Sequence, residues 1–131
     1  MTTPKPGQKV RGSQSGRPIM ALLDLLGRRW SLRILWELHQ HGPSSFRILQ
    51  TFCDDLSPTV LSARLSDLRE AGIIEHRDRE GYVITAEGIA LGRIIEQLNI
   101  WAEGWAARVT PVHSGNLIKP DRTKPAKNKQ K

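Results

Sequence analysis

The segment "DDLSPTVLSARLSDLREAGII", residues 54–74, determines the fold that we expect for this chain. Ser57 followed by Pro58 is typical of a helix N-terminus, and Gly72 is typical of the residue after a helix. Three leucines recur between these signals at helical spacing and predict one buried face: Leu61, Leu65 and Leu68. The segment therefore predicts a single amphipathic helix.

The opposite face of this helix carries unusually small residues for a surface that only meets water. Small side chains let a helix lie deep in a DNA groove, where Ser and Thr reach bases or phosphates and Arg pairs with guanine or phosphate. The amides after Ser57 would also suit a phosphate. The candidate contacts on this helix are Ser57, Thr59, Ser62, Ala63 and Arg64. The alternative is a plain amphipathic helix whose Arg64–Asp67 and Arg69–Glu70 charges are solvated.

The rest of the central region predicts four further helices and a hairpin. The helices are expected at 18–26, at 32–41 with Ser31 as its cap, at 46–52, and from Thr85 to about Arg108. Residues 73–84 predict two strands around a charged turn, with a short third edge at Ser44–Ser45. The expected fold is mainly α with a small β-hairpin. This is the winged helix-turn-helix order, in which the helix before the hairpin enters the major groove.

Three arginines outside the reading helix are candidates for phosphate contacts. Arg77 and Arg79 flank the hairpin tip, and Arg47 lies at the start of the third helix. Asp78 and Glu80 alternate with the hairpin arginines, so the tip taken alone favours a soluble turn of mixed charge. Its position directly after the reading helix favours a wing that touches DNA.

The last helix carries an apolar stripe with a spacing close to 3.5, which is typical of a seam with a partner helix. We expect a homodimer through the first and last helices, because two reading helices can recognise a palindrome. Packing within one chain is the alternative. The candidate interface residues are Leu22, Leu26, Leu91, Ile94, Leu98, Trp101 and Trp105.

The formal charge of +7 comes from the two ends of the chain. Residues 18–107 hold nine Lys and Arg against twelve Asp and Glu, and every lysine lies outside them. Both ends are poor in apolar residues, so we expect disordered basic tails at 1–17 and 109–131 around a domain at 18–108. The tails should add non-specific, salt-sensitive affinity for DNA. The acidic central region supports an alternative function, a winged-helix protein-interaction module in which only the tails bind nucleic acid.

Other function classes find little support in the sequence. A single cysteine, Cys53, excludes an internal disulfide and suits the cytoplasm, and no apolar stretch is long enough to predict a membrane span. His39 and His41 face different ways on a helix, and no phosphate loop or nucleophile motif occurs. We therefore expect no enzyme, metal or cofactor. Cys53 precedes two acids that would raise its pKa, which favours a partly buried residue over a redox switch.

Three segments carry a resemblance to a known family: "LLDLLGRRWSLRILWELHQHGPSSFRILQ", "LSPTVLSARLSDLREAGII" and "YVITAEGIALGRIIEQLNIWAEGW". Over residues 18–107 the chain resembles the HxlR-type winged helix-turn-helix regulators of bacteria. The resemblance implies a homodimeric, cytoplasmic transcription factor that binds operator DNA, and we expect a repressor. It places the recognition helix on Ser57–Ala71 and the wing on about Glu75–Tyr82.

The chain departs from this family in two places. Members often carry a Cys-Pro pair before the first helix, and in some the cysteine senses oxidants or electrophiles; this chain has Arg17-Pro18. Many relatives also have a basic residue where this chain has Thr59, which would weaken or retune DNA contact. A small-molecule effector remains open, and a weaker alternative is a sensor pocket at the dimer junction lined by Trp30, Trp36 and Trp101.

Overall fold

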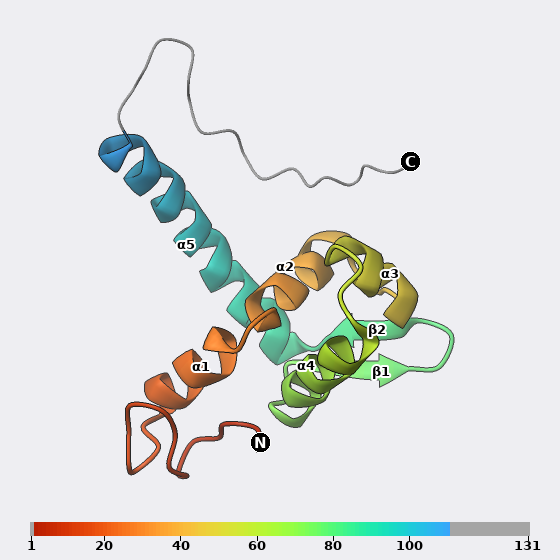
Figure 1. Cartoon of the computed structure of the whole chain (residues 1–131), viewed down its shortest axis with the longest axis horizontal. Helices are drawn as coiled ribbons and strands as arrows, with labels where there is room; N and C mark the ends of the chain where they lie inside the picture. The colour runs from red at the N-terminus through yellow and green to blue at the C-terminus, as the bar shows by residue number, and fades with distance from the viewer. Residues whose placement is uncertain (1, 111–131) are drawn as a thin grey trace. The chain divides into compact units, whose positions relative to one another are not determined.

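The computed structural model describes residues 2–110, and it has the element order that the sequence predicts (Figure 1). The elements are α1 (Pro18–Gly27), α2 (Ser31–His41), α3 (Phe46–Phe52), α4 (Pro58–Glu70), β1 (Ile74–Arg77), β2 (Gly81–Ile84) and α5 (Ala86–Val109). A mainly helical fold with one hairpin is therefore confirmed. The chain divides into two compact units after Gly92, within α5. The tail expected at 109–131 lies outside the described residues from position 111 onward.

Helix α2 forms the centre of the first unit. It packs against α1, α3, α4 and β2, which explains why its apolar residues span a wide arc. The largest side chains that this unit buries almost completely come from α2, α3, α4 and β1: Ile34, Leu35, Leu38, Leu49, Leu61, Leu65, Leu68 and Ile74.

Side-chain caps fix the start of three helices. The hydroxyls of Ser45, Ser57 and Thr85 accept hydrogen bonds from the amides of Ile48, Val60 and Gly88 at 3.1, 3.2 and 3.1 Å. The expected cap at Ser31 is wrong. Trp30 precedes α2 in the left-handed region, with φ of 77°, and Ser31 lies in the first turn. The Ser31 hydroxyl is buried there and has no hydrogen-bond partner within residues 2–110.

The hairpin is a regular antiparallel pair with a third edge. Ile74 faces Ile84 and Arg77 faces Gly81. Ser44 and Tyr82 exchange two backbone hydrogen bonds of 3.0 and 2.8 Å, as expected for the short edge near Ser44. Gly81 has φ of 86°, and a Cβ there would lie 2.6 Å from the Ser44 carbonyl oxygen. The start of β2, next to the tip of the wing, therefore requires glycine.

The N-terminal segment is placed against the first unit, in contrast to the disordered tail expected at 1–17. Thr3 and Val10 are 5% and 7% exposed. Val10 pairs with Ser13, whose hydroxyl accepts hydrogen bonds from the amides of Gly16 and Arg17 at 3.1 and 3.0 Å. The buried Thr3 and Val10 side chains and the turn at Ser13 therefore fix this segment, although its composition is polar.

Candidate nucleic-acid interface

A tight turn sets the angle between α3 and α4. Asp54 and Asp55 both adopt left-handed backbone conformations, with φ of 60° and 58°. The Gln50 side-chain amide donates to the Leu56 carbonyl at 2.8 Å, which closes the turn over Cys53. Asp tolerates the left-handed region better than most residues, so this sequence suits two consecutive positions of positive φ. The result is a helix-turn-helix in which α4 is the second helix.

Helix α4 has the two faces that the sequence predicts. Leu61, Leu65 and Leu68 are at most 1% exposed and pack into the first unit. Four of the five candidate DNA contacts on and before this helix lie exposed: Ser57, Thr59, Ser62 and Ala63. A helix that shows only small side chains around its N-terminal turns leaves room for a groove wall to approach its backbone.

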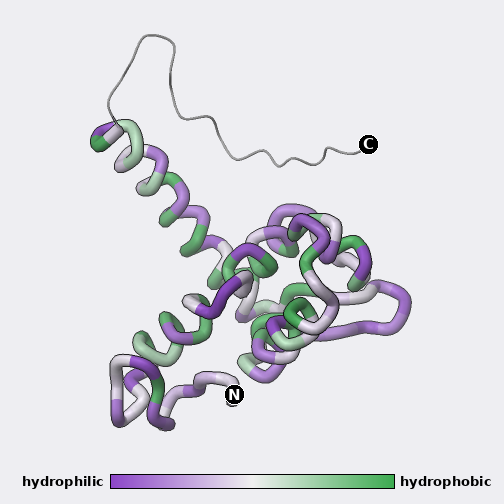
Figure 2. The backbone as a smooth tube through the Cα atoms, in the orientation of Figure 1, coloured by the Kyte–Doolittle hydropathy of each residue, from purple (hydrophilic) through white to green (hydrophobic). Residues whose placement is uncertain are grey.

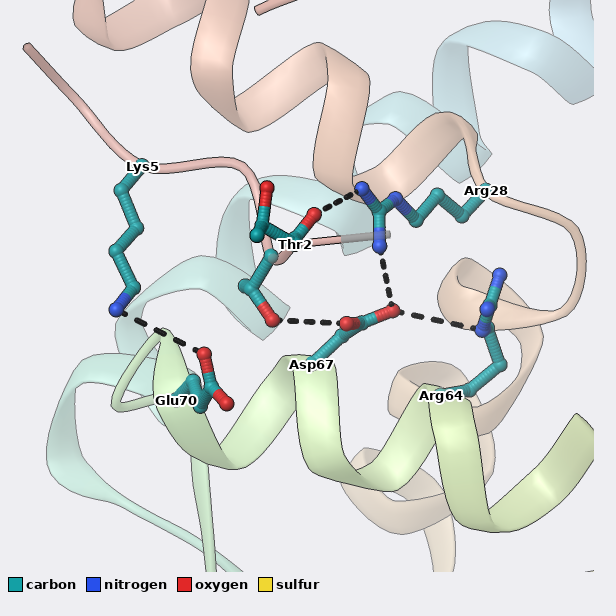
Figure 3. Close-up of polar contacts among 7 residues, drawn as sticks. Thr2, Lys5, Arg28, Arg64, Asp67 and Glu70 are labelled. Carbon is teal, nitrogen blue, oxygen red and sulfur yellow. Dashed lines mark hydrogen bonds and ion pairs between the residues drawn. The ribbon is translucent and has the colours of Figure 1, made fainter. Parts of the chain in front are cut away.

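Arg64, the fifth candidate, is held by a buried carboxylate (Figure 3). Its Nε lies 3.5 Å from Oδ2 of Asp67, and its side chain is 21% exposed. Asp67 is 6% exposed and also accepts a hydrogen bond of 3.1 Å from Arg28, which follows α1. The alternative in which the Arg64–Asp67 charges are solvated is therefore wrong for Asp67. Sequence analysis did not identify this carboxylate as a structural residue.

The wing carries two arginines in different electrostatic states. Arg77 forms ion pairs with Glu75 and, at 3.5 Å, with Glu80. Its hydrogen bond to Glu75 raises the pKa of the guanidinium. Arg79 lies at the tip with φ of 76°, is exposed, and has no ion pair within residues 2–110. Figure 2 shows the whole tip as hydrophilic. Arg79 is therefore the more available cation of the wing.

Arg47 lies exposed in the first turn of α3, at the other end of the helix-turn-helix. Within the described part of the chain it makes no ion pair. Its charge is consequently available to a partner, as the sequence prediction of a phosphate contact requires.

Cys53 occupies the turn between α3 and α4 and is completely buried. Burial raises the pKa of its thiol to about 12, while Arg33 lowers it and Glu37 and Asp54 raise it further. The predicted direction of the shift is confirmed, although desolvation rather than the neighbouring acids is its main cause. The residue is more deeply enclosed than the partly buried position that we expected.

The candidate dimer residues differ in exposure. In the second unit Ile94, Leu98, Trp101 and Trp105 are 60%, 58%, 59% and 49% exposed, and the two indoles stack with centroids 5.7 Å apart. On α1 the exposed apolar residues are Ile19 and Leu23, at 56% and 53%, whereas Leu22 and Leu26 are half-buried, as is Leu91. The α5 stripe therefore fits the expectation of an exposed apolar interface better than Leu22 and Leu26 of α1 do.

Two features of other function classes are absent from residues 2–110. No helix there combines the length and apolar character that a membrane crossing needs. No group of three or more His, Cys, Asp or Glu side chains in this range is arranged to hold a metal ion.

A helix-turn-helix whose second helix presents small polar residues, followed by a wing, defines a winged helix-turn-helix DNA-binding protein. The model of the HxlR-like helix-turn-helix family matches residues 25–110. The chain belongs to this family, a class of transcriptional regulators and not of enzymes. The resemblance found in the sequence is thus confirmed.

Two curated relatives from Bacillus subtilis (strain 168) carry the same designation. The uncharacterized HTH-type transcriptional regulator YvaP is 32% identical over 90 residues, which cover 63% of this chain and 82% of YvaP. The HTH-type transcriptional regulator YodB is 28% identical over 85 residues, which cover 60% of this chain and 75% of YodB.

Two solved structures of YodB from B. subtilis are also similar. Its quinone-bound crystal structure has a TM-score of 0.61 at 28% identity, covering 66% of this chain and 96% of YodB. Its reduced form has a TM-score of 0.58 at 27% identity, covering 66% of this chain and 90% of YodB.

Proposed function

We propose that this regulator acts in the cytoplasm as a homodimeric repressor that reads a palindromic operator with α4. The observation that carries the proposal is the exposed N-terminal half of α4, where Ser57, Thr59, Ser62 and Ala63 present small side chains at the surface. Arg64 lies on the flank of this face, and Arg47, Arg77 and Arg79 are the proposed backbone contacts. A single helix reads few base pairs, so the proposal requires two copies of α4 about one turn of DNA apart.

Enlarging one small residue of α4 tests this surface directly. Ala63→Gln keeps a good helix former at an exposed position but adds bulk where the groove wall would approach. We expect at least about a tenfold loss of operator affinity in fluorescence anisotropy titrations, since a displaced helix loses several base contacts. The matched control is Ala90→Gln, because Ala90 is an exposed alanine on α5. Equal operator affinity for both variants would show that α4 does not read the groove.

A small-molecule effector is a second part of the proposal. Its support is that YodB, a relative in sequence and structure, has been solved bound to a quinone. Addition of 1,4-benzoquinone to this chain should shift its melting temperature and its operator affinity. Unchanged values of both, at quinone concentrations that change YodB, would remove this class of effector.

The acidic balance of residues 18–107 favours a second candidate function, a protein-interaction module. In that case the basic ends of the chain would supply all nucleic-acid binding. Such binding would show no sequence preference and would weaken steeply as salt rises.

A further inference from the structure

The N-terminal arm, defined here as residues 2–9, is anchored to α4 and to the end of α1. The Thr3 hydroxyl donates to Oδ1 of Asp67 at 2.8 Å, and both side chains are buried. Arg28 bonds Oδ2 of the same carboxylate and also donates to the Thr2 carbonyl oxygen (Figure 3). The buried Asp67 carboxylate accepts hydrogen bonds from both Thr3 and Arg28. It therefore joins the arm, the end of α1 and α4 at a single point.

This anchor places the arm beside the outward face of α4. A groove of about 610 Å³ separates the two, with Lys5 and Gln8 on the arm side and Ala63 and Ser66 on the helix side. Ala63 belongs to the face that we assign to the DNA groove. A duplex that receives α4 would therefore meet the arm at the edge of the same surface.

The charges of α4 and of the arm indicate what the arm can do in that position. The C-terminal half of α4 carries two carboxylates, Asp67 and Glu70, which would repel a phosphate backbone. Arg28 and Arg64 cover Asp67, and Lys5 lies 3.7 Å from Glu70. The Lys5 and Glu70 side chains are 46% and 51% exposed, and such exposed pairs contribute little, so Lys5 can turn to a phosphate at small cost.

We propose that the N-terminal arm is part of the DNA interface, with the Thr3–Asp67 hydrogen bond holding Lys5 where it contacts a backbone phosphate. The inference rests on the proposed function of α4 and adds a partner contact to it. Thr3 is a positioning residue in this arrangement, and Lys5 is the contact.

Three substitutions in the full chain test the arm, with binding measured on the duplex recovered by that chain from random DNA. Lys5→Gln removes the charge, and Thr3→Val removes the anchor while keeping the side-chain shape. Thr2→Val is the matched control, because Thr2 contributes only its backbone carbonyl to the anchor. Circular dichroism melts confirm that each variant is folded.

Loss of one phosphate contact lowers the slope of log affinity against log salt by about 0.9, which is about fivefold in affinity at about 0.15 M salt. We expect this change for Lys5→Gln and a similar change for Thr3→Val, with no change for Thr2→Val. Combining Thr3→Val with Lys5→Gln should lower the slope no further, because both remove the same contact.

Either of two results would overturn the arm proposal while leaving the proposed function intact. In one, Thr3→Val and Lys5→Gln bind the selected duplex with the affinity and slope of the unaltered chain. In the other, Thr3→Val binds more tightly, which would make the arm an inhibitory strap. If the unaltered chain selects no motif, the proposed function of α4 fails first and independently.

Discussion

At the scale of single residues, Asp67 connects more of the first unit than any other polar side chain of α4. It joins Thr3, Arg28 and Arg64, which come from the N-terminal arm, the end of α1 and its own helix. The Asp67 side chain is 8% exposed, whereas the side chain of Glu70, the other carboxylate in the C-terminal half of α4, is 51% exposed. These two acids of one helix therefore have different consequences for stability.

Asp67→Ala should lower the free energy of unfolding by about 3 kcal/mol, because it leaves the buried Arg28 guanidinium without its counter-charge. Urea denaturation followed by circular dichroism measures this change. Glu70→Ala is the matched control and should change stability by less than about 0.5 kcal/mol, since its ion pair is exposed. Equal losses for the two variants would contradict the structural role given to Asp67.

Cys53 should be almost unreactive while the protein is folded. Its side chain is completely buried and its pKa is raised to about 12, so the thiolate is rare at neutral pH. The pKa is higher in the folded than in the unfolded chain, so this group lowers stability as pH rises from about 9 towards 12. Labelling with a disulfide reagent at pH 8 should be slow in buffer and fast in urea. Rapid labelling of the folded protein would reopen a redox role.

At the scale of elements, the starts and ends of most helices follow from signals that lie within a few residues of each other. Ser57 with Pro58, Thr85, and Gly72 with φ of 78° mark their helices as the sequence predicts. The hairpin follows for the same reason, because strand alternation and turn residues are local. The residues at which these helices and strands begin and end are therefore well predicted from the sequence.

The wing gives the sharpest test at this scale. Gly81→Ala should lower the free energy of unfolding more than Gly72→Ala, although both glycines have positive φ. A Cβ at Gly81 meets the Ser44 backbone 2.6 Å away, whereas one at Gly72 meets nothing within 4 Å. Gly72→Ala should cost about 1 kcal/mol from backbone strain alone. Equal costs in urea denaturation would show that the Ser44–Tyr82 edge does not constrain the wing.

Contacts between distant parts of the sequence could not be predicted in the same way. Thr3 and Asp67 are 64 residues apart, and no periodic pattern relates them. The polar composition of residues 1–17 predicted disorder because it offers little apolar surface, yet a buried hydrogen bond and the buried Val10 place the arm. Ser31 had the right residue type for a cap, but Trp30 adopts the left-handed backbone conformation before α2 instead. Burial and tertiary partners decide such positions.

At the scale of the whole molecule, the chain combines an acidic central region with basic ends. The central region brings shape, in α4 and the wing, and the ends bring most of the positive charge. The proposed function thus assigns recognition and non-specific attraction to different parts of the sequence. A homodimer would double both contributions on one duplex.

The apolar stripe of α5 provides the test of dimerisation. Leu98→Asp places a charge at its centre and should convert a dimer to a monomer in sedimentation equilibrium, with loss of operator binding. Ile100→Asp adds the same charge at an exposed position about 200° around the helix from Leu98, at about 100° per residue, and should remain dimeric. A monomeric unaltered chain, or dimers of both variants, would rule out this stripe as the interface.

The central claim is that α4, in two copies, reads DNA sequence. In vitro selection from random duplex DNA with the full chain, at about 0.15 M salt, tests it most directly. We expect a palindromic motif whose half-sites lie about one helical turn apart. Binding without any motif, and with a steep dependence on salt, would contradict the claim and assign DNA binding to the basic ends of the chain.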